Sequence, residues 1–204
     1  MLVEALQINL TQMEDFQIRK MQLKSKMTMA KFELNFGDVI SIPLGENLYG
    51  FGQVINSYDN KSGSFLIAIF DFKSETLKDV KLESICSSKP LFLGFTFDAK
   101  IYHGHWLLIG NYKKNIPLIK KPYFKLGTPP NDIYLVDISG EIITEITEEM
   151  FNRLTYKTEI APIRYENALK AYYGLQEWID EDYNKILYQQ SINSNDIWMN
   201  SSSN

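Results

Sequence analysis

Three apolar segments joined by two turn sequences constrain the fold of this chain more than any other feature. Residues 37–44 are rich in β-branched side chains and end at a Gly-Glu-Asn turn, residues 45–47. Residues 49–55 return from that turn and place Gly50 and Gly52 on one face. Residues 64–70 form a nearly continuous apolar run, as expected of a central strand. The sequence therefore predicts an antiparallel meander that bends sharply, or is closely packed, at the two glycines.

A change of pattern near residue 146 separates the strands from the helices. Short strand-like segments continue over residues 91–97, 105–109, 123–126, 132–138 and 141–146. From a capping residue, Thr147, the spacing predicts two or three helices up to about residue 188. The expected class is therefore α+β: a mainly antiparallel curled sheet, an SH3-like open barrel at its start, with C-terminal helices packed on it.

Composition divides the chain into three regions. Residues 1–30 contain no Gly or Pro and five of the seven Met, so we interpret them as an N-terminal extension with helix-like leucine spacing. Residues 31–190 are expected to form one α+β domain. Residues 191–204 are rich in Ser and Asn, and we expect a mobile tail.

Overall composition narrows the class of protein. The 204 residues are 45% hydrophobic, which excludes a mainly disordered chain. A net charge of -4 disfavours a strongly basic nucleic-acid binder. The one cysteine, Cys86, excludes an intramolecular disulfide and favours a reducing cytoplasm. No apolar run reaches the length of about 18 residues that a membrane span needs, so no membrane association is expected.

Residues that could carry catalysis are few. The two histidines, His103 and His105, could lie on one face of a strand and, with Asp98, hold a metal ion in a small hydrolase. The glycine between them favours an exposed turn instead, so we expect no metal site. No Gly-x-Ser-x-Gly motif is present and Cys86 has no base partner nearby in the sequence. Asp71 ends the third strand, where we expect it to fix the next turn.

Charge is unevenly distributed along the chain. Residues 132–149 hold six acids and no base, and residues 180–182 add a second acidic cluster. Such acids can form an ordinary solvated surface, or they can steer a basic protein partner. The acids that we consider as candidates for contacting such a partner are Glu141, Glu145, Glu148, Glu149, Asp180, Glu181 and Asp182.

A lysine-rich stretch supports a second hypothesis, a β-barrel module that binds nucleic acid. Residues 102–125 hold five Lys and no acid. The lysines expected at phosphates are Lys113, Lys114, Lys120 and Lys121. Tyr112 or Tyr123 would stack on bases. The acidic balance of the whole chain makes this hypothesis the second choice.

Five segments between them contain spaced aromatic residues and glycines: GDVISIPLG from residue 37, YGFGQV from 49, IAIFD from 67, LFLGF from 91 and GHWLLIG from 104. Together they resemble the immunity protein 26 family of bacterial polymorphic toxin systems. Shorter similarities occur at residues 122–125 and 134–137, so the resemblance spans about residues 36–140. The matching positions, which we interpret as mainly structural, are Gly37, Asp38, Pro43, Gly50, Gly52, Phe70, Asp71, Trp106 and Gly110.

The resemblance implies a protein without catalytic residues or cofactors. Such a protein would bind and neutralise a cognate toxin in the cytoplasm of the producing cell, through an immunity-type domain over residues 31–190. Many toxins of this kind are basic nucleases, which agrees with the acidic charge of this chain. Nucleic acid itself is not an expected partner.

Overall fold

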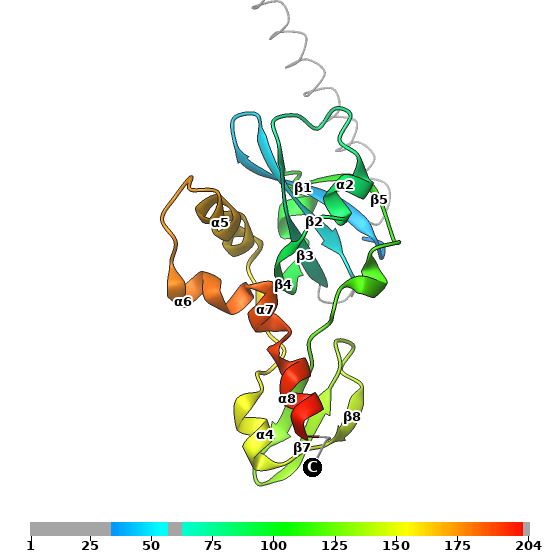
Figure 1. Ribbon diagram of the computed structural model, residues 1–204, viewed down its shortest axis with the longest axis vertical. Coiled ribbons are helices and arrows are strands. Elements are labelled where there is room, and N and C mark those ends of the chain that lie inside the picture. The colour runs from blue at the N-terminus through cyan, green and yellow to red at the C-terminus, as the bar shows by residue number, and fades with distance from the viewer. Residues whose placement is uncertain (1–33, 57–62, 202–204) are drawn as a thin grey trace, which may run out of the picture.

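The described residues form two mainly antiparallel sheets with helices packed around them (Figure 1). The computed structural model describes residues 34–56 and 63–201. The strands are β1 (Asp38–Gly45), β2 (Leu48–Val54), β3 (Ser64–Ser74), β4 (Pro90–Phe97), β5 (Leu107–Asn111), β6 (Phe124–Thr128), β7 (Asn131–Val136), β8 (Ile142–Glu145) and β9 (Glu159–Ile160). The α-helices are α2 (Leu82–Cys86), α3 (Ala99–Tyr102), α4 (Glu148–Arg153), α5 (Pro162–Tyr172), α6 (Asp180–Tyr183), α7 (Tyr188–Ser191) and α8 (Asn193–Ser201), and the 3-10 turns are η1 (Ile116–Leu118) and η2 (Asn184–Ile186).

The larger sheet has the strand order β5-β1-β2-β3-β4-β9. Strands β1 to β4 are antiparallel neighbours in chain order, and the first three form the meander with tight turns that the sequence predicts. β5 returns to pair with β1, and the short β9 adds to β4 in parallel. The sheet does not close, because β5 and β9 remain its two edges. The expected α+β class with a mainly antiparallel sheet is confirmed.

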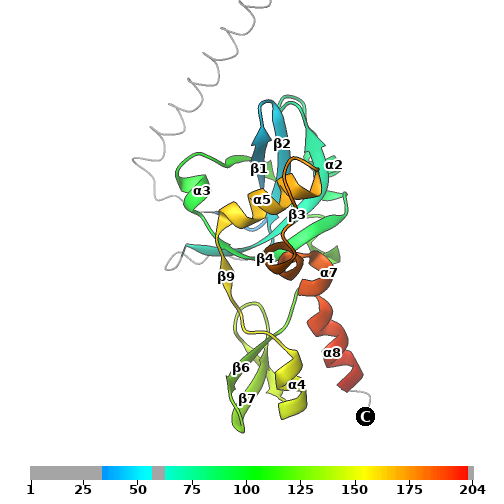
Figure 2. The same ribbon diagram turned by 90° about the vertical axis from the view of Figure 1, so that its left-hand side faces the viewer.

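Glycines in the larger sheet lie where helix α5 crosses it (Figure 2). The side chain of Leu169 occupies the space that a Cβ at Gly50 would need, and the Tyr165 hydroxyl does the same at Gly94. β2 also shifts its register to β3 just after Gly50. Close packing and a local irregularity, the two reasons for a glycine in a strand, therefore both apply.

Both faces of the larger sheet are buried. Ile40, Ile67 and Ile69 face α5, whose Tyr165 and Leu169 complete that core. The other face is covered by α2, η1 and α7. The residues of that second core include Val39, Phe51, Leu66, Ala68, Phe70, Ile85, Ile116 and Tyr188. Burial from both sides explains why β3 carries a nearly continuous apolar run.

The smaller sheet, β6-β7-β8, packs against α4 and α8. Its core includes Leu135 from β7, Phe151 from α4 and Ile197 from α8. Helix α8 falls within residues 191–204, where the sequence analysis expects a mobile tail. Buried Ile197 and partly buried Trp198 pack this helix on the core of the smaller sheet, and the backbone N–H of Tyr123 donates to Ser194 Oγ at 2.9 Å.

The two sheets lie at opposite ends of the long axis, so the molecule has two lobes (Figures 1 and 2). We call them the large lobe, around the larger sheet, and the small lobe, formed by β6–β8, α4 and α8. Three segments run between the lobes: residues 119–123, residues 154–160 and the α7–α8 connection. The N-terminal extension expected over residues 1–30 lies outside the described residues. None of the helices in the described ranges combines the length and the apolar character that crossing a bilayer requires.

Candidate functional site

Trp106 is 1% exposed and lies against α5 in the core of the large lobe. Its indole N–H donates to Glu166 Oε2 at 3.2 Å. Lys100 and Lys170 contact the same carboxylate at 3.0 and 2.7 Å. Burial alone would raise the pKa of Glu166, but the hydrogen bonds from Lys170, Lys100 and Trp106 outweigh it and lower this pKa. This cluster therefore holds α5 against the larger sheet. The Glu166 carboxylate remains charged there because Trp106, Lys100 and Lys170 are all in contact with it.

The start of β1 is held by Asp38. Its carboxylate accepts the backbone N–H of Asn35 at 2.7 Å and the side-chain amide of Asn111 at 2.8 Å. Gly37 has a φ of +93°, and a Cβ there would lie 2.7 Å from Lys113 Cγ. These contacts are structural: they join the first edge of the meander to β5 and the loop after it.

Strand pairing and local packing also explain the residue types at Pro43 and Gly110. β5 pairs only with residues 38–41 of β1, so the missing N–H of Pro43 removes no bond to β5. A Cβ at Gly110 would lie 2.7 Å from Cδ1 of Leu82, at the start of α2. Glycine therefore lets α2 approach the β5 edge.

Phe70 and Asp71 continue β3 with opposite environments. Phe70 is buried, whereas Asp71 accepts hydrogen bonds from the hydroxyls of Tyr172 and Tyr173 at 2.9 and 3.3 Å. Burial, then the charge of Asp71, raises the pKa of Tyr173. Lys73 lies 4.7 Å from the centroid of the Tyr173 ring. The Asp71 carboxylate thus anchors the end of α5 to β3.

The seven candidate acids divide between the two lobes. Asp180, Glu181 and Asp182 form the first turn of α6, beside α5 in the large lobe (Figure 1). Asp182 lies 3.3 Å from Arg164, and Asp180 accepts a hydrogen bond from Asn184. Two of these three acids therefore have local partners, and the α6 acids do not join the others in one patch.

The other four acids lie on the small lobe. Glu148 and Glu149 occupy the first turn of α4, which Thr147 caps by accepting the backbone N–H of Met150 at 3.2 Å. Negative charge is favourable at this end of a helix. Glu141 and Glu145 lie at the two ends of β8. All four carboxylates are on exposed residues.

A further acid of this stretch, Asp137, is held within a turn. Its Oδ1 accepts the backbone N–H groups of Ser139 at 2.7 Å and Glu141 at 3.0 Å. Burial acts to raise the pKa of Asp137, but these hydrogen bonds and the one from the Ser139 hydroxyl outweigh it and lower the pKa. Asp137 therefore shapes the turn before β8. Its carboxylate is less available to a partner than the carboxylates of the four exposed acids.

Strand β8 presents apolar as well as acidic side chains. Ile142 and Ile143 are 53% and 44% exposed. We call the surface formed by these two isoleucines and the neighbouring acids the β8 edge surface: Asp132, Glu141, Ile142, Ile143 and Glu145. The pKa of Tyr134 is raised by the Asp132 carboxylate, by desolvation and by the Glu145 carboxylate. The electrostatic potential on this surface is therefore negative.

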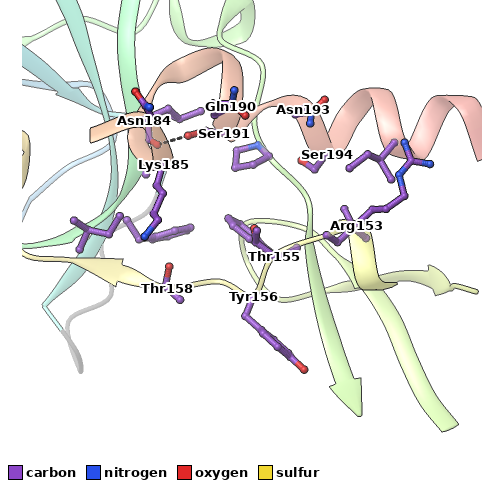
Figure 3. Close-up of a pocket in the computed structure, with 18 residues that line it drawn as sticks. Arg153, Thr155, Tyr156, Thr158, Asn184, Lys185, Gln190, Ser191, Asn193 and Ser194 are labelled. Atoms are coloured by element: carbon purple, nitrogen blue, oxygen red, sulfur yellow. Dashed lines mark hydrogen bonds between the residues drawn. The ribbon is translucent and has the colours of Figure 1, made fainter. Parts of the chain in front are cut away.

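A cavity of about 400 Å³ with a mixed polar and apolar lining lies between the lobes (Figure 3). Its polar lining includes Arg153, Thr155, Thr158, Asn184, Lys185, Gln190, Ser191, Asn193 and Ser194. Lys185 reaches into it, whereas the Tyr156 ring points away, and Ser191 Oγ donates to the Leu93 carbonyl at 2.7 Å. The described lining contains no carboxylate, imidazole or thiol, so it offers hydrogen-bond donors and positive charge without an acid–base pair.

The lysines of the nucleic-acid hypothesis are all exposed: Lys113, Lys114, Lys120 and Lys121. Lys120, Lys121 and Tyr123 line a second, more open hollow of about 1080 Å³, together with one acid, Asp137. Tyr112 is half-buried and its hydroxyl donates to Glu83 at 3.4 Å. Tyr123 therefore lies in the same hollow as Lys120 and Lys121, whereas the hydroxyl of Tyr112 is engaged with Glu83.

The groups considered for catalysis do not form a site in the described residues. His103 and His105 are exposed in the turn after α3, with ring centroids 6.5 Å apart. No group of three or more His, Cys, Asp or Glu side chains that could hold a metal ion occurs within residues 34–56 and 63–201. Burial raises the pKa of the Cys86 thiol to about 12, so it is not a nucleophile at neutral pH.

Sequence analysis missed three features: the role of Glu166, the edge position of β8 and the cavity between the lobes. Glu166 gave a signal, because its spacing of four residues from Lys170 places both on one helix face. The only sequence signal for the edge position of β8 was the adjacent pair Ile142 and Ile143, which lies between two acids. The cavity between the lobes gave no signal, because its lining comes from six separate stretches of chain.

The described residues form an α+β protein and hold no metal-ligand group. Residues 35–131 match the family model described as Immunity protein 26, so this part of the chain is similar to that family. Immunity proteins are generally not enzymes and generally have a toxin as partner. Comparison with curated proteins and with solved structures gave no match.

Proposed function

We propose that this protein neutralises a cognate toxin by binding it directly, without catalysis or a cofactor. The observation that carries the proposal is the match of residues 35–131 to Immunity protein 26. The match ends at the turn between β6 and β7. The β8 edge surface and α4 therefore follow the matched region, where they could serve a partner particular to this chain.

The exposed acids of the small lobe support a basic toxin as the partner. Complementary charge mainly speeds diffusional encounter and suppresses wrong partners. A basic nuclease is one toxin with this charge. Neutralisation would take place in the cytoplasm of the producing cell, where a lone, buried cysteine remains reduced.

Co-expression tests this function. The toxin domain encoded by the neighbouring gene is induced in cells with the full chain, and growth is scored together with co-purification of the two proteins. Rescue of growth with a stable complex is the expected result. Growth arrest despite soluble full chain would overturn the proposal. Rescue without any complex would overturn direct binding and indicate an indirect mechanism.

The same material tests the alternative. Retention of the full chain on single-stranded DNA or RNA that falls as salt is raised would support nucleic-acid binding instead. Replacing Lys120 and Lys121 by Ala would then reduce retention, whereas the complex with toxin should be unaffected. No retention at low salt would remove this alternative.

A further inference from the structure

Strand β8 has one unpaired side within the described residues. It is the last strand of the order β6-β7-β8. Ile146 N–H donates to the Ile133 carbonyl, and this bonded pair fixes the alternation along the two strands. The next pair, Glu145 opposite Tyr134, is then a non-bonded pair. The backbone N–H and C=O of Glu145 therefore point away from β7, toward the open edge.

The opposite edge of the small sheet is different. Lys125 N–H of β6 donates to the Thr155 carbonyl at 3.0 Å, and Lys125 forms a bridge with Tyr156. The connection between the lobes thus occupies the β6 edge. Among residues 34–56 and 63–201, no strand or bridge pairs with the outer side of β8, and its four residues include neither Lys nor Pro, two residues that commonly protect exposed edges.

The side chains of β8 favour an extended partner segment. Ile142, Ile143 and Thr144 are β-branched, and the two isoleucines are about half exposed. An added strand would cover these apolar groups and satisfy the outward backbone groups at the same time. Strand addition at an open sheet edge is a general mode of peptide recognition that combines both contributions.

Charge decides which segment fits. Glu145 lies in β8, Glu141 immediately precedes it, and Asp132 lies on the neighbouring β7; the Asp132 and Glu145 carboxylates both act to raise the pKa of Tyr134. A second copy of this chain would bring its own β8 acids against these, so self-pairing is disfavoured. A segment with Lys or Arg side chains would instead be attracted to them.

We propose that the open edge of β8 receives an extended, basic segment of the toxin as an added β-strand. This inference rests on the proposed function, and it identifies the surface and the binding mode. Backbone hydrogen bonds to Glu145 would hold the segment, while its basic side chains would meet Glu141 and Glu145. The acids alone would give attraction without a defined register, whereas the strand edge supplies the register.

Two substitutions at one position separate the backbone from the side chain. Glu145→Gln removes the charge and keeps the N–H, whereas Glu145→Pro removes both. Proline is tolerated where a strand N–H faces away from the sheet, and the residue before it favours extended backbone. Both variants should therefore fold, which an unchanged circular dichroism spectrum would verify.

Affinity is measured by calorimetry between the full chain and the toxin domain encoded by the neighbouring gene. We expect Glu145→Gln to weaken binding a few-fold, and Glu145→Pro to weaken it by at least about tenfold more, because a hydrogen bond is lost and the ring blocks the edge. Equal affinities for the two variants would overturn strand addition while leaving toxin binding intact. Toxin that fails to bind even the unsubstituted chain would overturn the proposed function as well.

Hydrogen exchange provides a readout that does not depend on a folded proline variant. In the free protein the outward amide of Glu145 should exchange quickly, and in the complex its exchange should slow by at least about tenfold. The amide of Thr144, which already faces β7, is the internal control. Rapid exchange of Glu145 in the complex, or concentration-dependent dimerisation through β8, would overturn the basic-strand assignment.

Discussion

Replacing Trp106 tests the interpretation that this residue holds α5 onto the larger sheet. Its side chain is 1% exposed, and its indole N–H contacts the buried Glu166. Trp106→Ala should destabilise the protein by about 3–5 kcal/mol through the cavity that it leaves. Trp106→Phe keeps much of the apolar volume but removes the N–H, so about 1.5–3 kcal/mol is expected for a hydrogen bond to a charged group.

Urea unfolding followed by far-ultraviolet circular dichroism measures these free energies. For a chain of this size, roughly 2–4 °C of melting temperature corresponds to 1 kcal/mol, so Trp106→Ala should melt roughly 6–20 °C lower. Leu108→Ala, two residues further along and 41% exposed, is the matched control and should change the unfolding free energy by less than about 1 kcal/mol.

The rank order of stability among the three variants tests the role of Trp106. Alanine should be the least stable, phenylalanine intermediate and the Leu108 variant close to the unsubstituted protein. A Trp106→Ala midpoint equal to that of Leu108→Ala would refute burial of the indole and would move Trp106 to the partner surface. A phenylalanine variant as stable as the parent would refute only the contribution of the bond to Glu166.

Three further predictions concern the charge of Glu166, the exposed acids of the two lobes and the anchoring of helix α8. Because the pKa of Glu166 lies below its ordinary value of 4.5, its ionised form stabilises the fold above that pH, and this contribution is lost as pH falls through the folded pKa. Glu166→Gln should therefore lose stability at pH 7 and show a flatter acid limb in unfolding free energy against pH; an unchanged acid limb would contradict this. Reversing Glu141, Glu145, Glu148 and Glu149 to Lys should slow association with the toxin by roughly tenfold at low salt, and less at high salt, whereas the matched reversal of Asp180, Glu181 and Asp182 should not; equal slowing by both would remove the small lobe from the encounter. Ile197→Ala should lower the free energy of unfolding of the small lobe by about 2–4 kcal/mol, and an unaltered midpoint would show that α8 is not anchored.

Local sequence signals predicted the elements that depend on local chemistry. The meander over β1 to β3 follows from apolar strand segments and glycine-containing turns, and Thr147 caps α4 as expected. Gly50 indicated that a group packs closely on β2 or that the sheet bends there. The sequence could not show that Leu169, more than a hundred residues away, is the group that does so.

Long-range packing explains the remaining differences. Nothing local marks Ile197 as buried, because its partners on β7 and α4 come from about 45 to 65 residues earlier. The acids of residues 132–149 and 180–182 look like one charged side in sequence, yet the α5 crossing places α6 beside the larger sheet and β8 in the other lobe. Periodicity finds elements, whereas the lobe to which an element belongs depends on contacts between distant segments.

The division into lobes also separates stability from the proposed recognition. The matched region, residues 35–131, supplies β1 to β6, and Trp106 within it is anchored by Glu166 of α5. The β8 edge surface lies on the small lobe, whose separate core includes residues of β7, α4 and α8. Substitutions in exposed acids of β8 therefore leave the packing around Trp106 unchanged, because the two sites share no partner. A surface arranged in this way can change its charge and side chains to suit a different toxin while the larger sheet keeps the same core.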